Sequence, residues 1–453
     1  MMMRLSELAA LLAAPLRGDD AAFDAVCTDT RSARRGDLFI ALRGERFDAH
    51  AFVAQAAAAG AVAAVVERPV ESPIAQIVVA NTLDALAVLG RHWRGRFDIP
   101  LIALTGSNGK TTVKEMLASI LRAQAGSEAV LATRGNLNNH IGVPLMLLEL
   151  RERHRFAAIE MGMNHPGEIA QLAAIGCPTV ALVNNAQREH MEFMTTVEAV
   201  ARENAAVFGV LPADGTAVVN ADDAHADFFR SAAGTHRIVD FGIEKPAAVS
   251  GGYVLKNLSS EIRLRTPAGE TSATLAIPGL HNVRNALAAC ACAHAVGIAP
   301  EVMRAGLNGF RPYHGRLQVK HAAGGATVID DTYNANPDSV RAAIDVLAEC
   351  PPPTVLILGD MGEVGDHAEA FHREVGAYAR SRNVSSLYAF GEKTRGAVEA
   401  FGAPASQAHS IEQLIERVQA CATPQATLLV KGSRFMRMER VVSALTGDTE
   451  EAH

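Results

Sequence analysis

The sequence lacks several features that would assign it to a membrane, a nucleic acid or a disulfide-stabilised class of protein. No run of roughly 18 consecutive apolar residues occurs, so no transmembrane helix is expected. No block of Lys or Arg occurs in a chain with a formal net charge of −7, which argues against a nucleic-acid partner. The six cysteines include no Cys-x-x-Cys pair, and we expect them all to be reduced thiols. These absences favour a cytoplasmic protein.

The composition is that of a folded protein with several domains. Hydrophobic residues make up 49% and charged residues 20% of the 453 residues, which is typical of soluble globular proteins. This length exceeds what a single hydrophobic core usually supports. Near the N-terminus, Leu5, Leu8 and Leu12 share one helical face, and polar residues interrupt the apolar run. We therefore expect a helix that begins a domain there, not a signal peptide.

Apolar segments divide the chain into three α/β zones. We expect a small N-terminal domain at 1–80, a central domain at 81–312 and a third domain at 313–453. In the last two zones strands alternate with helical periodicity, which predicts a mostly parallel P-loop-type sheet followed by a Rossmann-like domain. The predicted strands are 37–42, 61–66, 99–104, 156–159, 179–183, 216–219, 326–329, 354–358, 387–390 and 426–430.

The strongest single signal is a glycine-rich loop between a strand and a helix, with the sequence TGSNGKTT at 105–112. Backbone N–H groups of such a loop and the following helix N-terminus bind phosphate. We expect Lys110 to neutralise the β- and γ-phosphates and Thr111 to ligate Mg²⁺. The full Walker pattern would need glycine where Leu104 stands, so the loop is a short form. A glycine turn carrying a lysine by chance is the alternative, but its strand and helix context favours ATP binding.

Two further residues suit a metal site. Glu160 ends an apolar strand, where α/β sheets place ligand-binding groups, and a buried carboxylate there needs a cation. A helix cap or a salt bridge would also satisfy it. His190 follows the strand at 179–183 and its loop, and a lone histidine in such a place is often structural. Spacing alone leaves the role of His190 open.

At this point the chain resembles the Mur ligases, ATP-dependent amide ligases of bacterial cell-wall synthesis. The resemblance covers nearly the whole chain. Its motifs are TGSNGKTT at 105–112, GNLNNHIGVP at 135–144, EMGMN at 160–164 and PGLHNVRN at 278–285. The N-terminal segments TDTR at 28–31 and GDLFIALRG at 36–44 are similar to the family's UDP-substrate domain.

Within the family, two segments favour the members that add D-alanyl-D-alanine to a UDP-N-acetylmuramoyl-tripeptide. These are DDTYNANPD at 330–338 and LGDMGE at 358–363. An Asn-Pro-Arg motif, expected of members that add diaminopimelate, is missing from the sequence. The resemblance thus implies ATP and Mg²⁺ as cofactors, the UDP-linked tripeptide and D-alanyl-D-alanine as partners, and we expect a monomer.

The resemblance also implies roles for individual residues. Lys110, Glu160, His190 and Arg316 are the expected catalytic groups, and Thr111, Glu160 and His190 the expected metal ligands. Outside the resemblance, Asn282, Arg316 and Asp331 have plain alternatives as a helix cap, a surface residue and an Asx turn. The nucleotide-binding residues are expected to be Thr105, Gly106, Ser107, Asn108, Gly109, Lys110, Thr111, Thr112, Asn282, Arg316 and Asp331. The substrate-binding residues are expected to be Thr28, Asp29, Arg31, Asp48, Asn138, Asn139, Asn334 and Asn336.

One position departs from the family pattern. Members commonly carry a carbamylated lysine that supplies a negative charge to Mg²⁺, and alignment on Phe208 places Asn204 there. A neutral amide cannot supply this charge, so we expect the metal to be held differently, with help from the adjacent Glu203.

The implied chemistry is activation of a carboxylate by ATP, followed by attack of an amine on the acyl phosphate. Lys110 and Arg316 would offset the repulsion between carboxylate and phosphate, and domain closure would exclude water. Three alternatives stay open: a folylpolyglutamate synthase, a nucleotide-switched NTPase and an inactive sugar-nucleotide-binding protein. The N-terminal Asp29, Arg31 and Asp48 argue against the first, and the intact loop lysine argues against the last.

Overall fold

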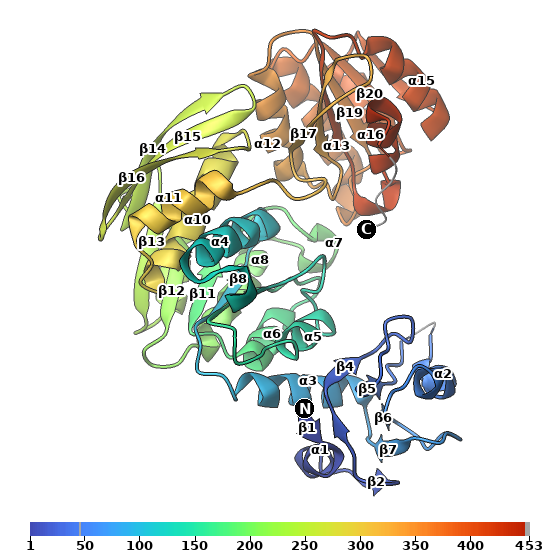
Figure 1. The fold of residues 1–453 in the computed structure, drawn as a ribbon. Helices are drawn as coiled ribbons and strands as arrows, with labels where there is room; N and C mark the ends of the chain where they lie inside the picture. Colours follow the sequence, from blue (N-terminus) through green and yellow to red (C-terminus); the bar gives the residue numbers. More distant parts are fainter. Residues whose placement is uncertain (45–46, 449–453) are drawn as a thin grey trace.

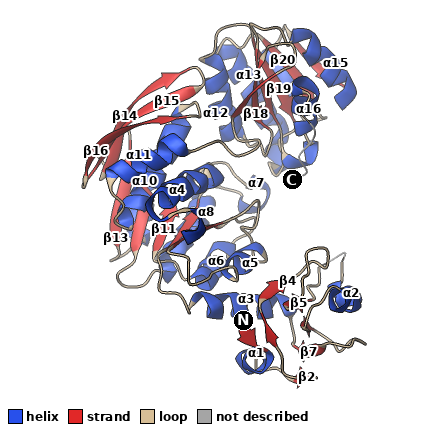
Figure 2. Ribbon diagram, viewed as in Figure 1, coloured by secondary structure: helices blue, strands red, loops and turns tan. Residues whose placement is uncertain are grey.

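The computed structural model describes residues 1–44 and 47–448 and has three α/β units in a row (Figure 1). The N-terminal unit lies at one end, the unit with the nine-stranded sheet in the middle and the C-terminal unit at the other end. Helices cover the sheets of the central and C-terminal units (Figure 2). The predicted fold class is confirmed, whereas the domain boundaries at 80/81 and 312/313 stay predictions.

The N-terminal unit is built on a five-stranded sheet with the order β2-β7-β6-β5-β4. β4 to β7 run parallel and β2 is antiparallel. The predicted opening helix is α1, in which Leu5 and Leu8 are fully buried. The elements are β1 (Met3–Arg4), α1 (Leu5–Leu11), β2 (Leu16–Arg17), β3 (Ala22–Phe23), β4 (Ala25–Cys27), β5 (Asp37–Ile40), η1 (Ala49–Phe52), α2 (Val53–Ala58), β6 (Ala63–Val66) and β7 (Ala75–Val78). α3 (Thr82–Arg94) follows and packs mainly against helices of the central unit.

The central sheet has nine strands in the order β16-β15-β14-β13-β12-β11-β8-β10-β9. β8 to β14 pair in parallel, and β14 to β16 form an antiparallel extension. The strands are β8 (Leu101–Thr105), β9 (Val130–Ala132), β10 (Phe156–Glu160), β11 (Val180–Val183), β12 (Thr216–Asn220), β13 (Arg237–Gly242), β14 (Val249–Lys256), β15 (Ser259–Thr266) and β16 (Gly269–Leu275).

Helices on both faces bury this central sheet. The first of them after the phosphate loop, α4, packs one apolar face against α10 and α11. The helices are α4 (Lys110–Ala125), η2 (Ser127–Ala129), α5 (Gly142–Leu147), α6 (Glu168–Gly176), α7 (Met191–Met194), α8 (Val197–Ala205), η3 (Ala206–Val210), α9 (Ala226–Ala232), α10 (Leu280–Ala295) and α11 (Pro300–Gly309).

The C-terminal unit has a six-stranded sheet in the order β17-β18-β22-β19-β20-β21. All pairs are parallel except β17 with β18. The elements are β17 (Gln318–His321), β18 (Thr327–Asp331), α12 (Pro337–Ala348), β19 (Thr354–Gly359), η4 (Gly365–His367), α13 (Ala368–Ser381), β20 (Ser386–Phe390), α14 (Arg395–Phe401), β21 (Ala405–Ala408), α15 (Ile411–Cys421), β22 (Thr427–Lys431), η5 (Arg434–Met436) and α16 (Glu439–Thr446).

The two larger sheets bring their polar strand ends to one place. β8, β10 and β11 are parallel neighbours and end at Thr105, Glu160 and Val183, so the segments that follow them share one edge of the central sheet. β18 and β22 do the same in the C-terminal unit, where they end at Asp331 and Lys431. The site described below lies between these edges. No helix in the described residues is both long and apolar enough to cross a bilayer.

Candidate active site

A cavity of about 900 Å³ lies between the central and C-terminal units. The phosphate loop, the end of β10, the loop after β11 and the start of α10 contribute from the central unit, and the segments after β18 and β22 from the C-terminal unit. Such a volume is within the usual range for a site that takes a small molecule or cofactor.

The phosphate loop has the backbone of an anion-binding turn. Gly106 and Gly109 have φ values of 131° and 83°, in the region that favours glycine. A Cβ on Gly109 would lie 2.3 Å from the side-chain oxygen of Asn285 on α10, so no larger residue fits. α4 begins directly after Gly109 and points its N-terminal N–H groups at the loop. The short form of the loop therefore keeps the phosphate-binding geometry.

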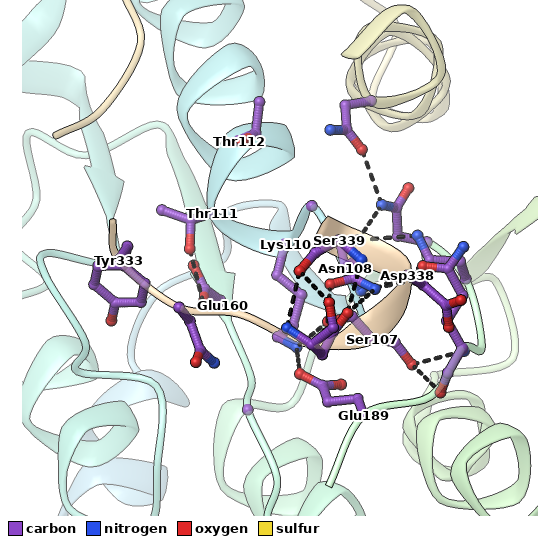
Figure 3. Close-up of a pocket in the computed structure, with 18 of the residues that line it drawn as sticks. Ser107, Asn108, Lys110, Thr111, Thr112, Glu160, Glu189, Tyr333, Asp338 and Ser339 are labelled. Atoms are coloured by element: carbon purple, nitrogen blue, oxygen red, sulfur yellow. Dashed lines mark hydrogen bonds and ion pairs between the residues drawn. The ribbon is translucent and has the colours of Figure 1, made fainter. Parts of the chain in front are cut away.

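Lys110 is held by this loop and by one carboxylate (Figure 3). Its ammonium group donates to the carbonyl of Ser107 at 3.1 Å and to that of Gly106, and lies 2.8 Å from Glu189 Oε1. The side chains of Lys110 and Glu189 are only 13% and 12% exposed. Glu189 thus occupies the position beside the ammonium group that a phosphate oxygen would take.

Glu160 fits a cation site. Its Oε1 accepts hydrogen bonds from Asn138 at 2.8 Å and from the Thr111 hydroxyl at 3.3 Å. Its Oε2 is buried and has no hydrogen-bond partner. Within 1–44 and 47–448 no group of three acidic, His or Cys side chains is placed to hold a metal ion. One carboxylate with a Thr hydroxyl matches Mg²⁺, which usually completes its shell with water and substrate phosphates.

His190 lies between two carboxylates. Its Nδ1 is 2.7 Å from Glu363 of the C-terminal unit, and its Nε2 is 3.5 Å from Glu189. Burial alone would lower the pKa of His190, but the hydrogen bonds to Glu189 and Glu363 outweigh burial and raise the pKa to about 9. In this arrangement the ring is protonated at neutral pH, so metal ligation would require it to lose a proton and one partner.

The C-terminal unit adds two cations to the cavity. Arg316 lies over the ring of Tyr333, 4.1 Å from its centroid, and donates to the Thr111 hydroxyl at 3.3 Å. Its Nε is buried without a hydrogen-bond partner. Lys431 at the end of β22 forms an ion pair with Asp331 at 2.6 Å. Asp331 also accepts from the backbone of Leu317, so both of its oxygens are engaged.

Lys431 was not predicted from the sequence as a residue of the site, although it directly follows the predicted strand 426–430. Its place at the carboxyl end of a parallel strand was the signal that could have found it. Burial lowers its pKa, and its side chain is 3% exposed.

Asn282 hydrogen-bonds within the start of its own helix, as the plain alternative expects, and it also lines the cavity. Its amide donates to the carbonyl of Pro278 at 2.7 Å, and its oxygen accepts from Asn285 at 3.1 Å. These bonds fix the first turn of α10. The neighbouring His281 also lines the cavity, with its Nε2 3.1 Å from the Asn282 amide nitrogen.

Four predicted substrate-binding asparagines line the cavity. Asn138 contacts Glu160, and Asn139 accepts from two backbone N–H groups at the start of α5. Asn336 caps α12 and donates to Asn108 Oδ1 at 2.8 Å, across the two units. The backbone carbonyl of Asn334 accepts a hydrogen bond from Lys431.

The predicted substrate-binding residues of the N-terminal unit, Thr28, Asp29, Arg31 and Asp48, do not line this cavity. Asp29 pairs with Arg31 at 2.6 Å. Asp48 pairs with His50 at 2.6 Å and with Arg68 at 2.8 Å. The structure therefore brings the predicted nucleotide-binding residues together at the cavity, except Thr105 and Gly106, which do not line it, and leaves these four on a separate unit.

Asn204 lies behind the phosphate loop. It is fully buried on α8, accepts a hydrogen bond from Thr105 at 2.6 Å and donates to the carbonyl of Val200 at 3.0 Å. The expectation that Glu203 helps to hold the metal is wrong. Both Glu203 oxygens accept backbone N–H groups at the start of α6, from Gly167 and Ile169, so the carboxylate caps a helix.

Comparison with known proteins decides the family. The Mur ligase middle-domain model matches residues 104–293, the Mur ligase glutamate-ligase-domain model matches 315–434, and the Mur ligase family catalytic-domain model matches 23–94. A relative from Escherichia coli strain K12, a UDP-N-acetylmuramoyl-tripeptide–D-alanyl-D-alanine ligase, is 40% identical over 97% of this chain and 98% of its own. The chain belongs to the Mur ligase family.

Solved Mur ligase structures have the same three-unit fold. A crystal structure of MurF from Acinetobacter baumannii superposes with a TM-score of 0.91 at 37% identity, covering 98% of both chains. A MurF ligase from Thermotoga maritima, in complex with ADP, gives a TM-score of 0.82 at 25% identity, covering 93% of this chain and 96% of its own. As a Mur ligase, this chain is an ATP-dependent ligase of peptidoglycan synthesis.

Proposed function

We propose that this chain joins D-alanyl-D-alanine to a UDP-N-acetylmuramoyl-tripeptide in the cytoplasm, as a monomer that uses ATP and Mg²⁺. The observation that carries the proposal is the cavity between the units, which the phosphate loop with Lys110 lines from the central unit and Arg316 and Lys431 line from the C-terminal unit. Full-length relatives named for this reaction give the substrate pair.

The side chains of the cavity suit the activation of a carboxylate by ATP. The phosphate loop would bind the β- and γ-phosphates, with Lys110 released from Glu189 to contact them. Arg316 already reaches Thr111 from the opposite unit, so it would offset negative charge where the carboxylate meets the γ-phosphate. Thr111 and Glu160 would hold Mg²⁺, which would neutralise phosphate charge when bound.

The reaction would proceed in two steps. A carboxylate oxygen of the tripeptide forms a bond to the γ-phosphorus while the bond from that phosphorus to ADP breaks. The amine of D-alanyl-D-alanine attacks the acyl carbon, phosphate leaves with the oxygen that it gained, and the amine loses a proton. Asn138, Asn139, Asn334 and Asn336 line the cavity on both sides and are proposed to orient the substrates. The N-terminal Thr28, Asp29, Arg31 and Asp48 are proposed to contact the UDP moiety.

A phosphate-release assay tests this proposal. Phosphate should be released from ATP only when the UDP-linked tripeptide and D-alanyl-D-alanine are both present, and Mg²⁺ removal by EDTA should stop release. Comparable release with neither substrate would instead indicate a nucleotide-switched NTPase and would overturn the proposal.

A further inference from the structure

Arg188 connects the central and C-terminal units beside the cavity. It lies in the loop 184–190 that follows β11, and its guanidinium group lies between Asp338 on α12 and Glu374 on α13. Nitrogen-to-oxygen distances are 2.5 Å to Asp338 and 2.7 Å to Glu374, and the backbone N–H of Arg188 also donates to Asp338 at 3.0 Å. Arg188 therefore ties the loop to two different helices of the other unit.

This cluster differs from an ordinary surface ion pair, which contributes little. The side chains of Arg188, Asp338 and Glu374 are between 23% and 30% exposed, and each carboxylate receives more than one hydrogen bond from Arg188. The guanidinium carbon also lies 5.1 Å from the centroid of Phe371. Hydrogen bonding from Arg188 holds the pKa of Glu374 below its usual range. Paired charges that are partly removed from water are costly to break.

The next two residues of the loop face the cavity. Glu189 pairs with Lys110, and His190 pairs with Glu363 of the C-terminal unit. Figure 3 shows Glu189 beside Lys110, with Asp338 at the start of the neighbouring C-terminal helix. An arrangement of the C-terminal unit that broke the Arg188 contacts would therefore also separate His190 from Glu363, directly beside the carboxylate that pairs with Lys110.

We propose that Arg188 is a positioning residue, which stabilises the docked arrangement of the C-terminal unit and so holds the two halves of the nucleotide site together. It acts through the loop and touches no reacting atom. This inference rests on the proposed ligation, because it is the ATP site of that reaction that both units form. Because Arg188 favours the docked arrangement over an undocked one, its loss lowers the fraction of protein molecules that can bind ATP. The apparent KM for ATP then rises.

The test compares Arg188→Ala with Arg341→Ala in the full chain. Arg341 also pairs with Glu374, at 2.9 Å, but both residues belong to the C-terminal unit. Arg188→Ala should raise the KM for ATP on the order of tenfold while kcat at saturation stays within about twofold, because substrates that bind across the units restore docking. Small-angle X-ray scattering without ligands should show a larger radius of gyration. Arg341→Ala should match the wild type in both readouts.

Wild-type values of KM and radius of gyration in Arg188→Ala would overturn the inference. Circular dichroism shows whether Arg188→Ala folds; if it does not, Arg188→Lys replaces it. A lysine keeps the charge but lacks the planar guanidinium group that donates more than once to each carboxylate, so intermediate values are expected, and unchanged values would overturn the inference. Failure of the proposed function can be told apart from failure of this inference. In the first case the wild type would not ligate, while the scattering comparison would still report on docking.

Discussion

Lys110 lies at the start of α4 with its ammonium group already engaged by two loop carbonyls and Glu189. Its side chain points toward polar groups of the cavity. It therefore contributes a positive charge to the site and does not pack in the hydrophobic core. The function of a Mur ligase should therefore be separable from the fold at this residue.

Lys110→Ala should lower the ligation rate on the order of 10²–10³-fold, because one charge that faces the transferred phosphoryl group is lost. The far-ultraviolet circular dichroism should stay near wild type, because Lys110 packs no core. Lys256→Ala is the matched control, since Lys256 lies on an exposed hairpin strand and pairs only with Glu261 among the described contacts. A ligation rate of Lys110→Ala within a few-fold of the control would contradict the assigned role.

Asn204 takes part in a buried hydrogen-bond network. Its amide nitrogen is not nucleophilic and cannot take up carbon dioxide, so no carbamate forms at this position. The ligation rate in buffer freed of carbon dioxide should not change when bicarbonate is restored. Asn204→Ala should cost about 1–3 kcal/mol of stability, because the Thr105 hydroxyl loses its buried acceptor. A bicarbonate-dependent rate would show that a lysine elsewhere in the site is carbamylated.

His281 provides a test that depends on pH. Burial lowers the pKa of His281 to about 4, and its Nε2 faces a donor, the Asn282 amide. The folded pKa lies below the unfolded value, so stability is fully present above about pH 6.5 and is lost as the pH falls toward 4. From pH 7 to pH 5 this residue should account for roughly 1–2 kcal/mol of lost stability.

The measurement is urea unfolding of the wild type and His281→Gln at both pH values, together with an NMR titration of the ring. The variant should lose less stability over this interval than the wild type. Equal losses, or a ring that titrates near 6.5, would contradict the predicted environment.

At the scale of elements, the contact between α4 and α11 supports the phosphate loop. Gly306 on α11 lies against α4 so closely that a Cβ would be 2.4 Å from the Cα of Ile120. Gly309, one turn later on the same helix, has Ser119 Oγ at 3.8 Å as its nearest neighbour. Both glycines therefore belong to α11, but only Gly309 has room for a Cβ.

Gly306→Ala should destabilise the protein by about 1–3 kcal/mol, because the added methyl group forces the two helices apart. Gly309→Ala should stay within about 1 kcal/mol of wild type. The urea midpoints of the two variants check this prediction. Because α4 begins at the phosphate loop, we also expect Gly306→Ala to bind ATP more weakly than the wild type. Equal midpoints would contradict the packing.

Elements that carry their own local signal were predictable from the sequence. β8, β10, β11, β12, β18, β19, β20 and β22 lie where apolar runs predicted strands, and the phosphate loop lies between β8 and α4. The antiparallel strands β14 to β16 were not predicted, because they contain no apolar run: most of β14 is exposed, and β15 alternates exposed and buried residues. The pairings of Lys110 with Glu189 and of Arg188 with α12 and α13 join residues 79 to 186 positions apart. No local pattern encodes such contacts.

At the scale of the whole molecule, the site exists only because two units meet. The phosphate loop, Thr111 and Glu160 come from the central unit, and Arg316, Asp331 and Lys431 from the C-terminal unit. The N-terminal unit stands apart from this cavity, at the far end of the molecule from the C-terminal unit (Figure 1). Under the proposed function, the N-terminal unit would bind the UDP part of the substrate and the other two units would bind ATP, so this separation would suit a large substrate.

The most direct test of the account follows an oxygen atom. The UDP-linked tripeptide is prepared with ¹⁸O in its terminal carboxylate and incubated with the protein, ATP, Mg²⁺ and D-alanyl-D-alanine. Activation of the carboxylate through an acyl phosphate predicts that mass spectrometry finds one ¹⁸O in the released phosphate and a product longer by the dipeptide. Phosphate without ¹⁸O, or phosphate release with no lengthened product, would contradict the central claim.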